Sequence, residues 1–366
     1  MKFQFLRAAC CLAALVWLLK ADSFEDLAAR ATSARAADDI PHAIELYRQA
    51  LAINPKWQEG WWYLGSLQYD TDQYAGGRDA LAHLVELTPD AAPALGLLGL
   101  CEFETGAYAQ ALTHIQRSLA LGAPSQPQMD RVLRYHEALL LAVMGNFEEA
   151  IQKYSWLLQH GSGNPTVVMS MGAAALRSPV LPQKAPTEQQ ALYTMAGKAV
   201  AFTMAGDVNS AEQTYTEMIE KFPQAMNVHY LHGCFLLNAH PEQAINEFQR
   251  ELELSPANPA AAAMLSWILM RRGDLQLAMP YAAKAVEGAP KLAIGQMVLG
   301  RLLVETGTID KGIQHLEIAE RLNPGFLGTH LSLATAYSRT GRTEDARRER
   351  QLSIRMMKEP TPVAQP

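Results

Sequence analysis

The densest group of side chains that could do chemistry lies between residues 229 and 240, where histidine and cysteine occur close together. His229 and His232 are three residues apart, so on a helix they would share one face, as paired zinc ligands do. Cys234 lies five residues beyond His229, about 140° around a helix of 3.6 residues per turn, and would point elsewhere. His240 follows in a predicted turn. Because two helical imidazoles leave a zinc shell incomplete, the sequence predicts no metal site.

Motifs for nucleophilic or phosphate chemistry do not occur in the sequence. Gly161-Ser162-Gly163 lacks both the G-x-S-x-G spacing and the preceding strand of a nucleophile elbow, so we interpret it as a turn between helices. No glycine-rich nucleotide loop or zinc-protease helix is present. We therefore predict no catalytic residues and no cofactor. A clustered pair of acids, or a Ser–His pair in a groove, would favour an enzyme instead.

The elements that position these residues are predicted to be helices. Of the 366 residues, 49% are hydrophobic and only 8% are aromatic. Runs of β-branched residues with period two, which would indicate strands, are missing. The composition therefore favours an all-α chain.

The N-terminus is typical of an export signal. Lys2 and Arg7 precede a continuous apolar run, 8–19, and small residues follow at Ala21 and Ser23. The run is shorter than the roughly 20 residues that span a bilayer. We predict a signal peptide at 1–23, cleaved after Ser23, and an exported periplasmic or extracellular protein without a stable membrane span. An uncleaved N-terminal anchor is the alternative.

The net charge argues against an anionic partner. The full chain has a formal net charge of −6, and removal of 1–23 takes away three basic residues and one acidic residue, which leaves −8. An acidic surface repels nucleic acid and anionic lipid, so neither is expected as the main partner.

A step of 34 residues runs through the chain, marked by prolines that close successive units. Within the units the spacing W-x2-L-G recurs on the first of two predicted helices, and glycine recurs in the turn between them. The residues that carry these patterns are Pro55, Pro89, Pro256, Pro290 and Pro324; Trp61, Leu64 and Gly65; Leu95, Leu98 and Gly99; and Gly145, Gly206, Gly273, Gly307 and Gly341.

This pattern resembles the tetratricopeptide repeat over nearly all of the mature chain. The resemblance implies a right-handed α-solenoid of helix–turn–helix repeats. His229 and His232 occupy the positions that tryptophan and leucine usually fill. In a solenoid, repeats far apart in the sequence lie far apart in space, so we expect Cys101 and Cys234 to be two buried free thiols.

The resemblance also implies where partners bind, because the first helices of such repeats line the concave surface. About half of the mapped residues are expected to pack between repeats instead. Lysine and asparagine are scarce at these positions, so a clamp for a partner's C-terminal carboxylate is not expected. The predicted groove residues are Trp62, Tyr69, Phe103, Tyr135, Tyr193, Tyr230, Trp267 and Arg301.

One proline-rich segment interrupts the repeats. Three prolines between Ser178 and Pro186 replace the expected second helix after 168–172. We predict repeat blocks at 24–160 and 187–358, the second ending in a capping helix, joined by an irregular helix and loop at 161–186. We also expect the segment Ser178–Pro186 to be the first site of proteolysis. Residues 359–366 are predicted to be a disordered tail.

These observations favour a non-catalytic scaffold in the cell envelope that binds other proteins or extended peptides. A solenoid that binds a small ligand or glycan remains an alternative, as does an N-terminally anchored envelope assembly factor. The sequence leaves the partner, the biological process and the oligomeric state open.

Overall fold

The computed structural model describes residues 22–122 and 127–358. Within these ranges the protein has nineteen α-helices, one short 3-10 helix and no strand, which confirms the predicted all-α class. No helix in these ranges combines the length and the apolar character needed to cross a membrane. Residues 1–21 of the predicted signal segment and the whole predicted tail, 359–366, lie outside the described residues.

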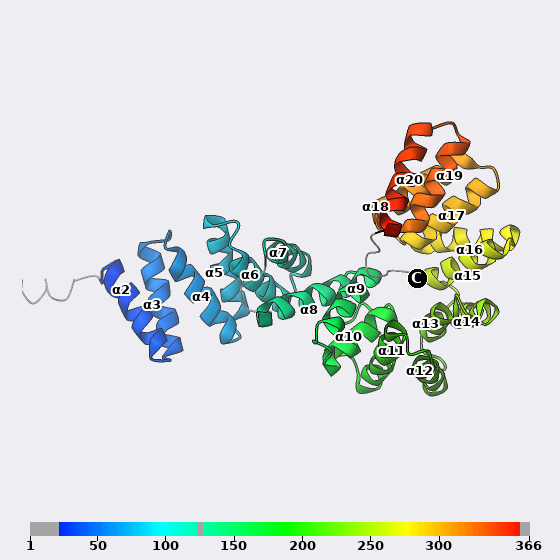
Figure 1. Ribbon diagram of the computed structural model, residues 1–366. Coiled ribbons are helices and arrows are strands. Elements are labelled where there is room, and N and C mark those ends of the chain that lie inside the picture. The colour runs from blue at the N-terminus through cyan, green and yellow to red at the C-terminus, as the bar shows by residue number, and fades with distance from the viewer. Residues whose placement is uncertain (1–21, 123–126, 359–366) are drawn as a thin grey trace, which may run out of the picture. The chain divides into compact units, whose positions relative to one another are not determined.

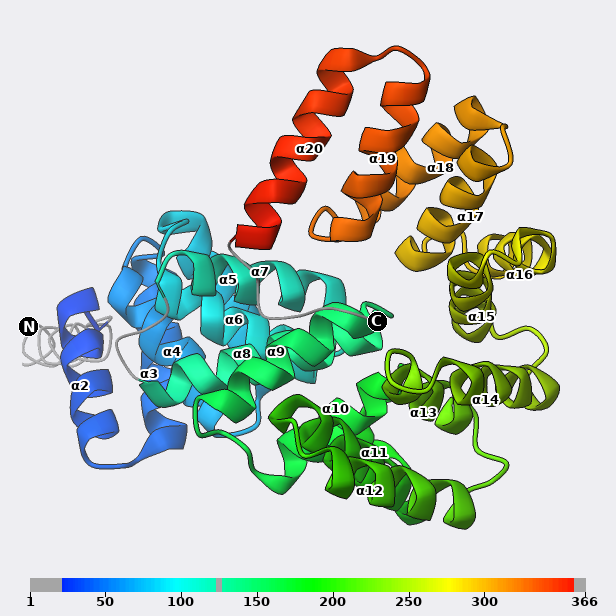
Figure 2. The same cartoon turned by 45° about the vertical axis from the view of Figure 1, so that its right-hand side comes forward.

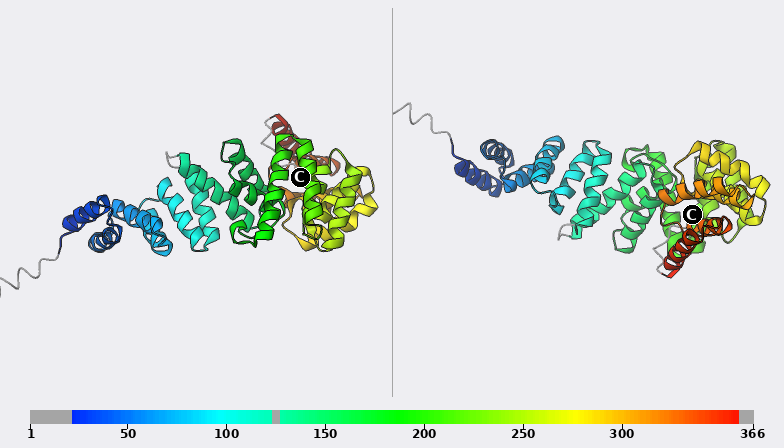
Figure 3. Two further views of the ribbon diagram at one scale, coloured as in Figure 1. Left: turned by 90° about the horizontal axis from the view of Figure 1, so that it is seen from below. Right: turned by 90° about the horizontal axis from the view of Figure 1, so that it is seen from above.

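The chain divides into two compact units, with the boundary after Leu140. In the first unit successive helices lie side by side in chain order (Figures 1 and 3). The helices of this unit are α2 (Phe24–Ala36), α3 (Ile40–Ile53), α4 (Gln58–Asp70), α5 (Tyr74–Leu87), α6 (Ala92–Glu104), α7 (Tyr108–Ala120) and most of α8 (Pro127–Val143).

The second unit continues as helix pairs, which Figure 2 shows one after another from α11 to α20. The predicted block boundaries at 160 and 186 mark where the sequence repeats stop and resume. They stay a prediction. The helices of this unit are α9 (Phe147–Gln159), α10 (Pro165–Ala175), η1 (Pro182–Lys184), α11 (Thr187–Ala205), α12 (Val208–Lys221), α13 (Val228–Leu236), α14 (Pro241–Leu254), α15 (Pro259–Arg272), α16 (Leu275–Gly288), α17 (Ala293–Glu305), α18 (Ile309–Leu322), α19 (Leu327–Arg339) and α20 (Thr343–Lys358).

Local chemistry sets the ends of the helices. Asn164 precedes Pro165, and its side chain accepts a hydrogen bond from the Val167 amide at 2.9 Å. Asn258 caps α15 in the same way, by accepting from two backbone amides at 3.1 Å. Asparagine before proline therefore begins a helix at both places, as these residue types favour. The five predicted turn glycines have φ between 74° and 93°, a region that L-residues seldom adopt.

Within each repeat the two helices approach closely at the glycine of the W-x2-L-G pattern. A Cβ on Gly65 would lie 2.5 Å from Cγ of Leu81, and one on Gly99 would lie 2.6 Å from Cγ1 of Ile115. Both distances are shorter than van der Waals contact, so these positions require glycine. Glycine at these positions therefore lets the paired helices come close.

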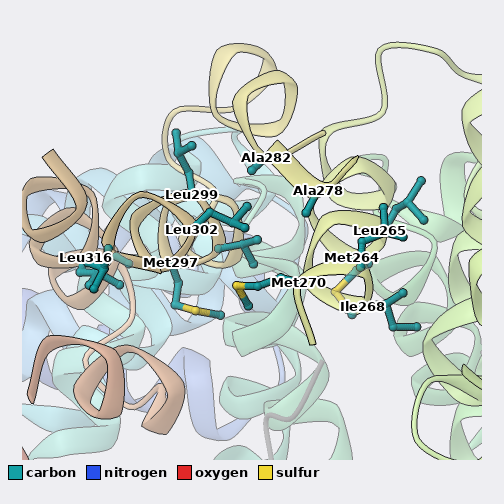
Figure 4. Packing of buried hydrophobic residues seen from close by; sticks show 14 of the residues in the cluster. Met264, Leu265, Ile268, Met270, Ala278, Ala282, Met297, Leu299, Leu302 and Leu316 are labelled. Carbon is teal, nitrogen blue, oxygen red and sulfur yellow. The ribbon is translucent and has the colours of Figure 1, made fainter. Parts of the chain in front are cut away.

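The core of the second unit is continuous over several repeats. Ala278 and Ala282 of the second helix α16 lie among larger apolar side chains of the neighbouring first helices α15 and α17 (Figure 4). Methionine fills the spaces between them, as the thioether side chain does well. Labelled members of this core are Met264, Leu265, Ile268 and Met270 of α15, Ala278 and Ala282 of α16, Met297, Leu299 and Leu302 of α17, and Leu316 of α18.

The structure corrects one expectation about the proline-rich segment. We expected the second helix after 168–172 to be missing, but α11 packs tightly against α10 and lies in that place. Pro182 and Ala185 of the loop between them are buried. The prolines therefore lengthen the connection between two packed helices and do not remove a packing partner.

Candidate partner-binding surface

Four of the predicted groove residues lie on three consecutive first helices of the first unit. Trp62 and Tyr69 are on α4, Phe103 is on α6 and Tyr135 is on α8, and all four side chains are half-buried. The Phe103 ring meets the ring of His136 at 4.9 Å between centroids, and Tyr135 meets the same imidazole at 5.5 Å. The structure thus brings Phe103 and Tyr135 into one cluster of rings through His136.

Three of these four aromatic side chains pack on the core of the unit. Trp62, Tyr69 and Phe103 contact the buried cluster that includes Leu97 and Leu100. Burial raises the pKa of the Tyr69 phenol and lowers the pKa of the His136 imidazole, so both groups are neutral near pH 7. A neutral, half-buried aromatic surface can accept apolar side chains without a large desolvation cost.

Tyr193 is not part of an open surface, and this corrects its prediction as a groove residue. Its side chain on α11 is only 1% exposed. The hydroxyl lies 2.7 Å from Oγ of Ser178 in a hydrogen bond. Because α10 packs against α11, this ring lies in the core where the regular repeat pattern would have exposed it.

Tyr230 is also engaged inside the protein. Its hydroxyl interacts with the side chains of Arg177 and Cys234, and its ring lies 6.2 Å from that of Phe248. Burial raises the pKa of Tyr230 well above its ordinary value. We therefore assign Tyr230 to packing between the end of α10 and α13, and not to partner contact.

Trp267 and Arg301 keep exposed surface on first helices of the second unit. The guanidinium of Arg271 lies 4.5 Å from the centroid of the half-buried Trp267 ring, in a cation–π contact. Arg301 pairs weakly with Glu305 on its own helix, at 3.8 Å from Nε to Oε1. It also borders a cavity of about 200 Å³ between α17 and α19, which Val304, Glu305, Leu331, Ser332 and Thr335 line as well.

A family profile described as tetratricopeptide repeat matches residues 28–92, 64–126 and 236–293. These matches cover helix pairs of both units, and the 34-residue step continues through the helices that follow. The chain is a tetratricopeptide-repeat protein. Repeats of this kind supply shape and surface for contact with other proteins, so the coarse function is that of an interaction scaffold.

Solved structures similar to this tetratricopeptide-repeat protein include MamA and Tom70. MamA from Desulfovibrio magneticus RS-1 is 19% identical over 48% of this chain and 98% of its own, with a TM-score of 0.38. Yeast Tom70 is 11% identical over 90% of this chain and 91% of its own, with a TM-score of 0.36. A comparison with curated proteins found no matching sequence. These likenesses add nothing to the choice of a partner.

Several tetratricopeptide repeats share a hydrogen bond at the first position of the W-x2-L-G pattern. Trp61 donates its indole N–H to the carbonyl oxygen of Pro55 at 2.8 Å. Gln296 donates its amide N–H to the carbonyl oxygen of Pro290 at 2.7 Å. The same bond joins Nε2 of His330 to the carbonyl oxygen of Pro324 at 2.8 Å. Three different N–H groups thus tie a first helix to the proline that closes the preceding repeat.

His229 and His232, the paired histidines of the sequence, lie beside carboxylates of neighbouring helices. Nδ1 of His229 lies 2.6 Å from Oε2 of Glu247, and Nδ1 of His232 lies 3.4 Å from Oε1 of the same residue. Nε2 of His232 lies 3.7 Å from Oε1 of Glu212. Burial raises the pKa of Glu247, but the hydrogen bond from His229 and the nearby His232 imidazole outweigh it and lower the pKa to about 2. Cys234 contacts Tyr230 instead of joining this group.

Sequence reasoning missed the partners of these groups. Glu247 lies 15 residues after His232, on the paired helix α14, and only the fold brings it close. Arg177, two residues after α10, was also missed; it has a positive φ of 55°, and its guanidinium carbon lies 5.9 Å from the centroid of the Tyr230 ring. Cys101 and Cys234 are unpaired, as expected. Cys101 is buried, but Cys234 is partly exposed, which corrects the expectation that both thiols are buried.

Proposed function

We propose that this protein is a non-catalytic scaffold that binds an extended segment of a partner protein along the first helices of its repeats. The observation that carries the proposal is the row of half-buried aromatic side chains on α4, α6 and α8, namely Trp62, Tyr69, Phe103 and Tyr135. Rigid aromatic rings lose little entropy on contact, which makes them effective anchors for a partner.

The cavity beside Arg301 is a poor fit for a small ligand. Its volume is about 200 Å³, whereas pockets for small molecules usually hold about 300–1,000 Å³. Its rim carries one guanidinium and one carboxylate that already pair with each other. A short polar side chain of a bound protein segment fits this hollow better than a glycan or cofactor.

We propose further that the protein works outside the cytoplasm after removal of 1–23. This rests on the charged start, the short apolar run and the small residues of the sequence. Ser23 caps α2 by accepting from the Asp26 amide at 3.2 Å, so cleavage after Ser23 would leave α2 with a new N-terminal ammonium in place of a cap. N-terminal sequencing of the native protein tests this, and an intact Met1 in a soluble cytoplasmic fraction would contradict it.

The binding surface is tested with two neighbouring tryptophans of α4. Partners captured from envelope extract by the mature chain are identified by mass spectrometry, and their affinity is then measured directly. Trp62→Ala should weaken binding by about 2 kcal/mol, roughly thirtyfold, because an anchor ring is lost. Trp61→Ala is the matched control, since Trp61 makes the internal bond to Pro55.

The two variants separate binding from folding. Trp61→Ala should lower the melting temperature and leave the affinity of the folded fraction unchanged, whereas Trp62→Ala should mainly lower affinity. If Trp62→Ala melts earlier but binds the captured partner as the wild type does, the aromatic row packs repeats together and the proposed surface is wrong.

A further inference from the structure

The last repeat contains a buried group of ionisable side chains that the scaffold does not require. Glu320 on α18, His330 on α19 and Glu349 on α20 each place one ligand atom within 4.8 Å of the others. His330 is 3% exposed and Glu349 is 0% exposed, while Glu320 is partly exposed. Buried charged groups are costly unless other groups offset them. Ion pairs with His330 and Arg348 offset the charge of Glu349, whereas the ion pairs found in the described residues include none for Glu320.

The preceding repeat shows which side chains can fill the equivalent positions without a cluster of charges. Positions 34 residues earlier hold Val286, Gln296 and His315. There Oε1 of Gln296 lies 2.7 Å from Nδ1 of His315, a neutral hydrogen bond between the paired helices. The same backbone frame is therefore completed without any carboxylate, and the two acids of the last repeat are additions to it.

The orientation of the His330 ring follows from the bond that recurs at this repeat position. Nε2 contacts the carbonyl oxygen of Pro324 at 2.8 Å, and a carbonyl only accepts, so Nε2 carries the hydrogen. Nδ1 lies 2.7 Å from Oε2 of Glu349, in a hydrogen bond that needs a proton on Nδ1 because the carboxylate only accepts. A metal ion would displace this proton, and Nδ1 would then bind the ion while Nε2 stays fixed on the backbone carbonyl.

The second carboxylate ligand is held in a similar way. Nε of Arg348 donates to Oε1 of Glu349 at 3.1 Å, which leaves Oε2 facing His330 and Glu320. Outer hydrogen bonds of this kind fix the orientation of ligands around metal ions. Glu320 has no such bond among those found in the described residues, and its partial exposure provides a route from solvent.

We propose that Glu320, His330 and Glu349 bind one divalent transition-metal ion, with Zn²⁺ as the best fit. One imidazole and two carboxylates suit such an ion, whereas Mg²⁺ and Ca²⁺ prefer ligand sets made only of oxygen. The cation would join α18, α19 and α20 and offset the negative charge of the two acids. Its effect would be to fasten the last helix pair to the repeat before it.

The test is zinc titration of the full mature chain by calorimetry after treatment with a chelator, together with thermal melting. The wild type should bind one Zn²⁺ per chain and melt at a higher temperature with Zn²⁺ than with chelator. Glu320→Gln should weaken zinc binding at least tenfold and abolish the thermal shift. Glu317→Gln is the matched control, because it makes the same change on α18 at a residue outside the cluster, and it should bind as the wild type does.

A second variant covers the case in which Glu320→Gln does not fold. The double substitution His330→Gln with Glu349→His copies the Gln296 and His315 pair of the preceding repeat, and it should fold but lose the zinc-dependent rise in melting temperature. Absence of saturable zinc binding by the folded wild type would overturn the proposal. Unchanged zinc affinity in Glu320→Gln, or tighter binding of Mg²⁺ or Ca²⁺ than of Zn²⁺, would also overturn it.

Discussion

Gly172 of α10 and Gly197 of α11 meet where the two helices cross, and neither position has room for a side chain. A Cβ on Gly172 would overlap the carbonyl oxygen of Tyr193, and one on Gly197 would overlap that of Val168. Backbone atoms cannot move aside as the end of a side chain can, so this crossing requires glycine at both positions.

Gly172→Ala is therefore expected to lower the free energy of unfolding by about 3 kcal/mol, because the two helices must separate. Urea unfolding followed by circular dichroism measures the change. Gly163→Ala is the control, since a Cβ there would meet only the Leu158 side chain, at 3.2 Å. Equal unfolding midpoints for Gly172→Ala and the wild type would show that the helices do not cross as described.

The loop 178–186 is expected to be the first interior segment that a protease cuts, and it is tied down mainly through α11. Oγ of Ser178 bonds the Tyr193 hydroxyl at 2.7 Å, and Nε2 of Gln190 donates to the carbonyl oxygen of Ala185 at 2.8 Å. Tyr193→Phe removes the first of these bonds, so it should destabilise the loop by about 1 kcal/mol and speed cleavage several-fold. Limited proteolysis with mass mapping measures this, and an unchanged rate would mean that the bond does not hold the loop.

The buried carboxylate of Glu251 is expected to contribute strongly to the stability of the second unit. Glu251 is 0% exposed and accepts from the Asn227 amide at 2.8 Å, from the Tyr230 amide at 3.3 Å and from Nδ2 of Asn258 at 3.1 Å. It thereby satisfies the start of α13 and steadies the cap of α15.

Glu251→Ala should lower the free energy of unfolding by about 3 kcal/mol, since it leaves buried donors without an acceptor. Glu251→Gln keeps one acceptor oxygen and should lose less. Thermal melting of the two variants compares them. If alanine and glutamine melt alike, neither the acceptor oxygen nor the volume that glutamine keeps contributes measurably to stability.

Features that recur in every repeat could be predicted from the sequence. Contacts between helices that do not follow the regular repeat could not. The 34-residue step, the turn glycines and the asparagine caps act locally, so their positions could be derived from residue type alone. Tyr193 could not be placed correctly, because its burial follows from the crossing of α10 and α11 at Gly172. Glu320 was missed because its difference from Val286 has meaning only when the repeats are aligned and folded.

The contact of His229 and His232 with Glu247 predicts how stability depends on pH. Burial raises the pKa of Glu247, yet the two imidazoles lower it overall to about 2 from an ordinary value of 4.5. A carboxyl whose pKa is lower in the folded than in the unfolded state stabilises the fold above the unfolded pKa. That contribution is lost as the pH falls from about 4.5 toward about 2, because the unfolded chain binds the proton first.

Glu247→Gln removes this titration and should therefore reduce the acid sensitivity of the fold. The difference in melting temperature between the wild type and Glu247→Gln should be greatest above about pH 4.5 and shrink steadily below it. The control is the same comparison in a background with His229→Gln and His232→Gln, in which the partners of Glu247 are neutral and the pH dependence of the difference should largely disappear. A difference that stays constant from about pH 6 to about pH 2.5 in the wild-type background would contradict the stabilising role of the imidazoles, because a protonated Glu247 could no longer accept their hydrogen bonds as a carboxylate.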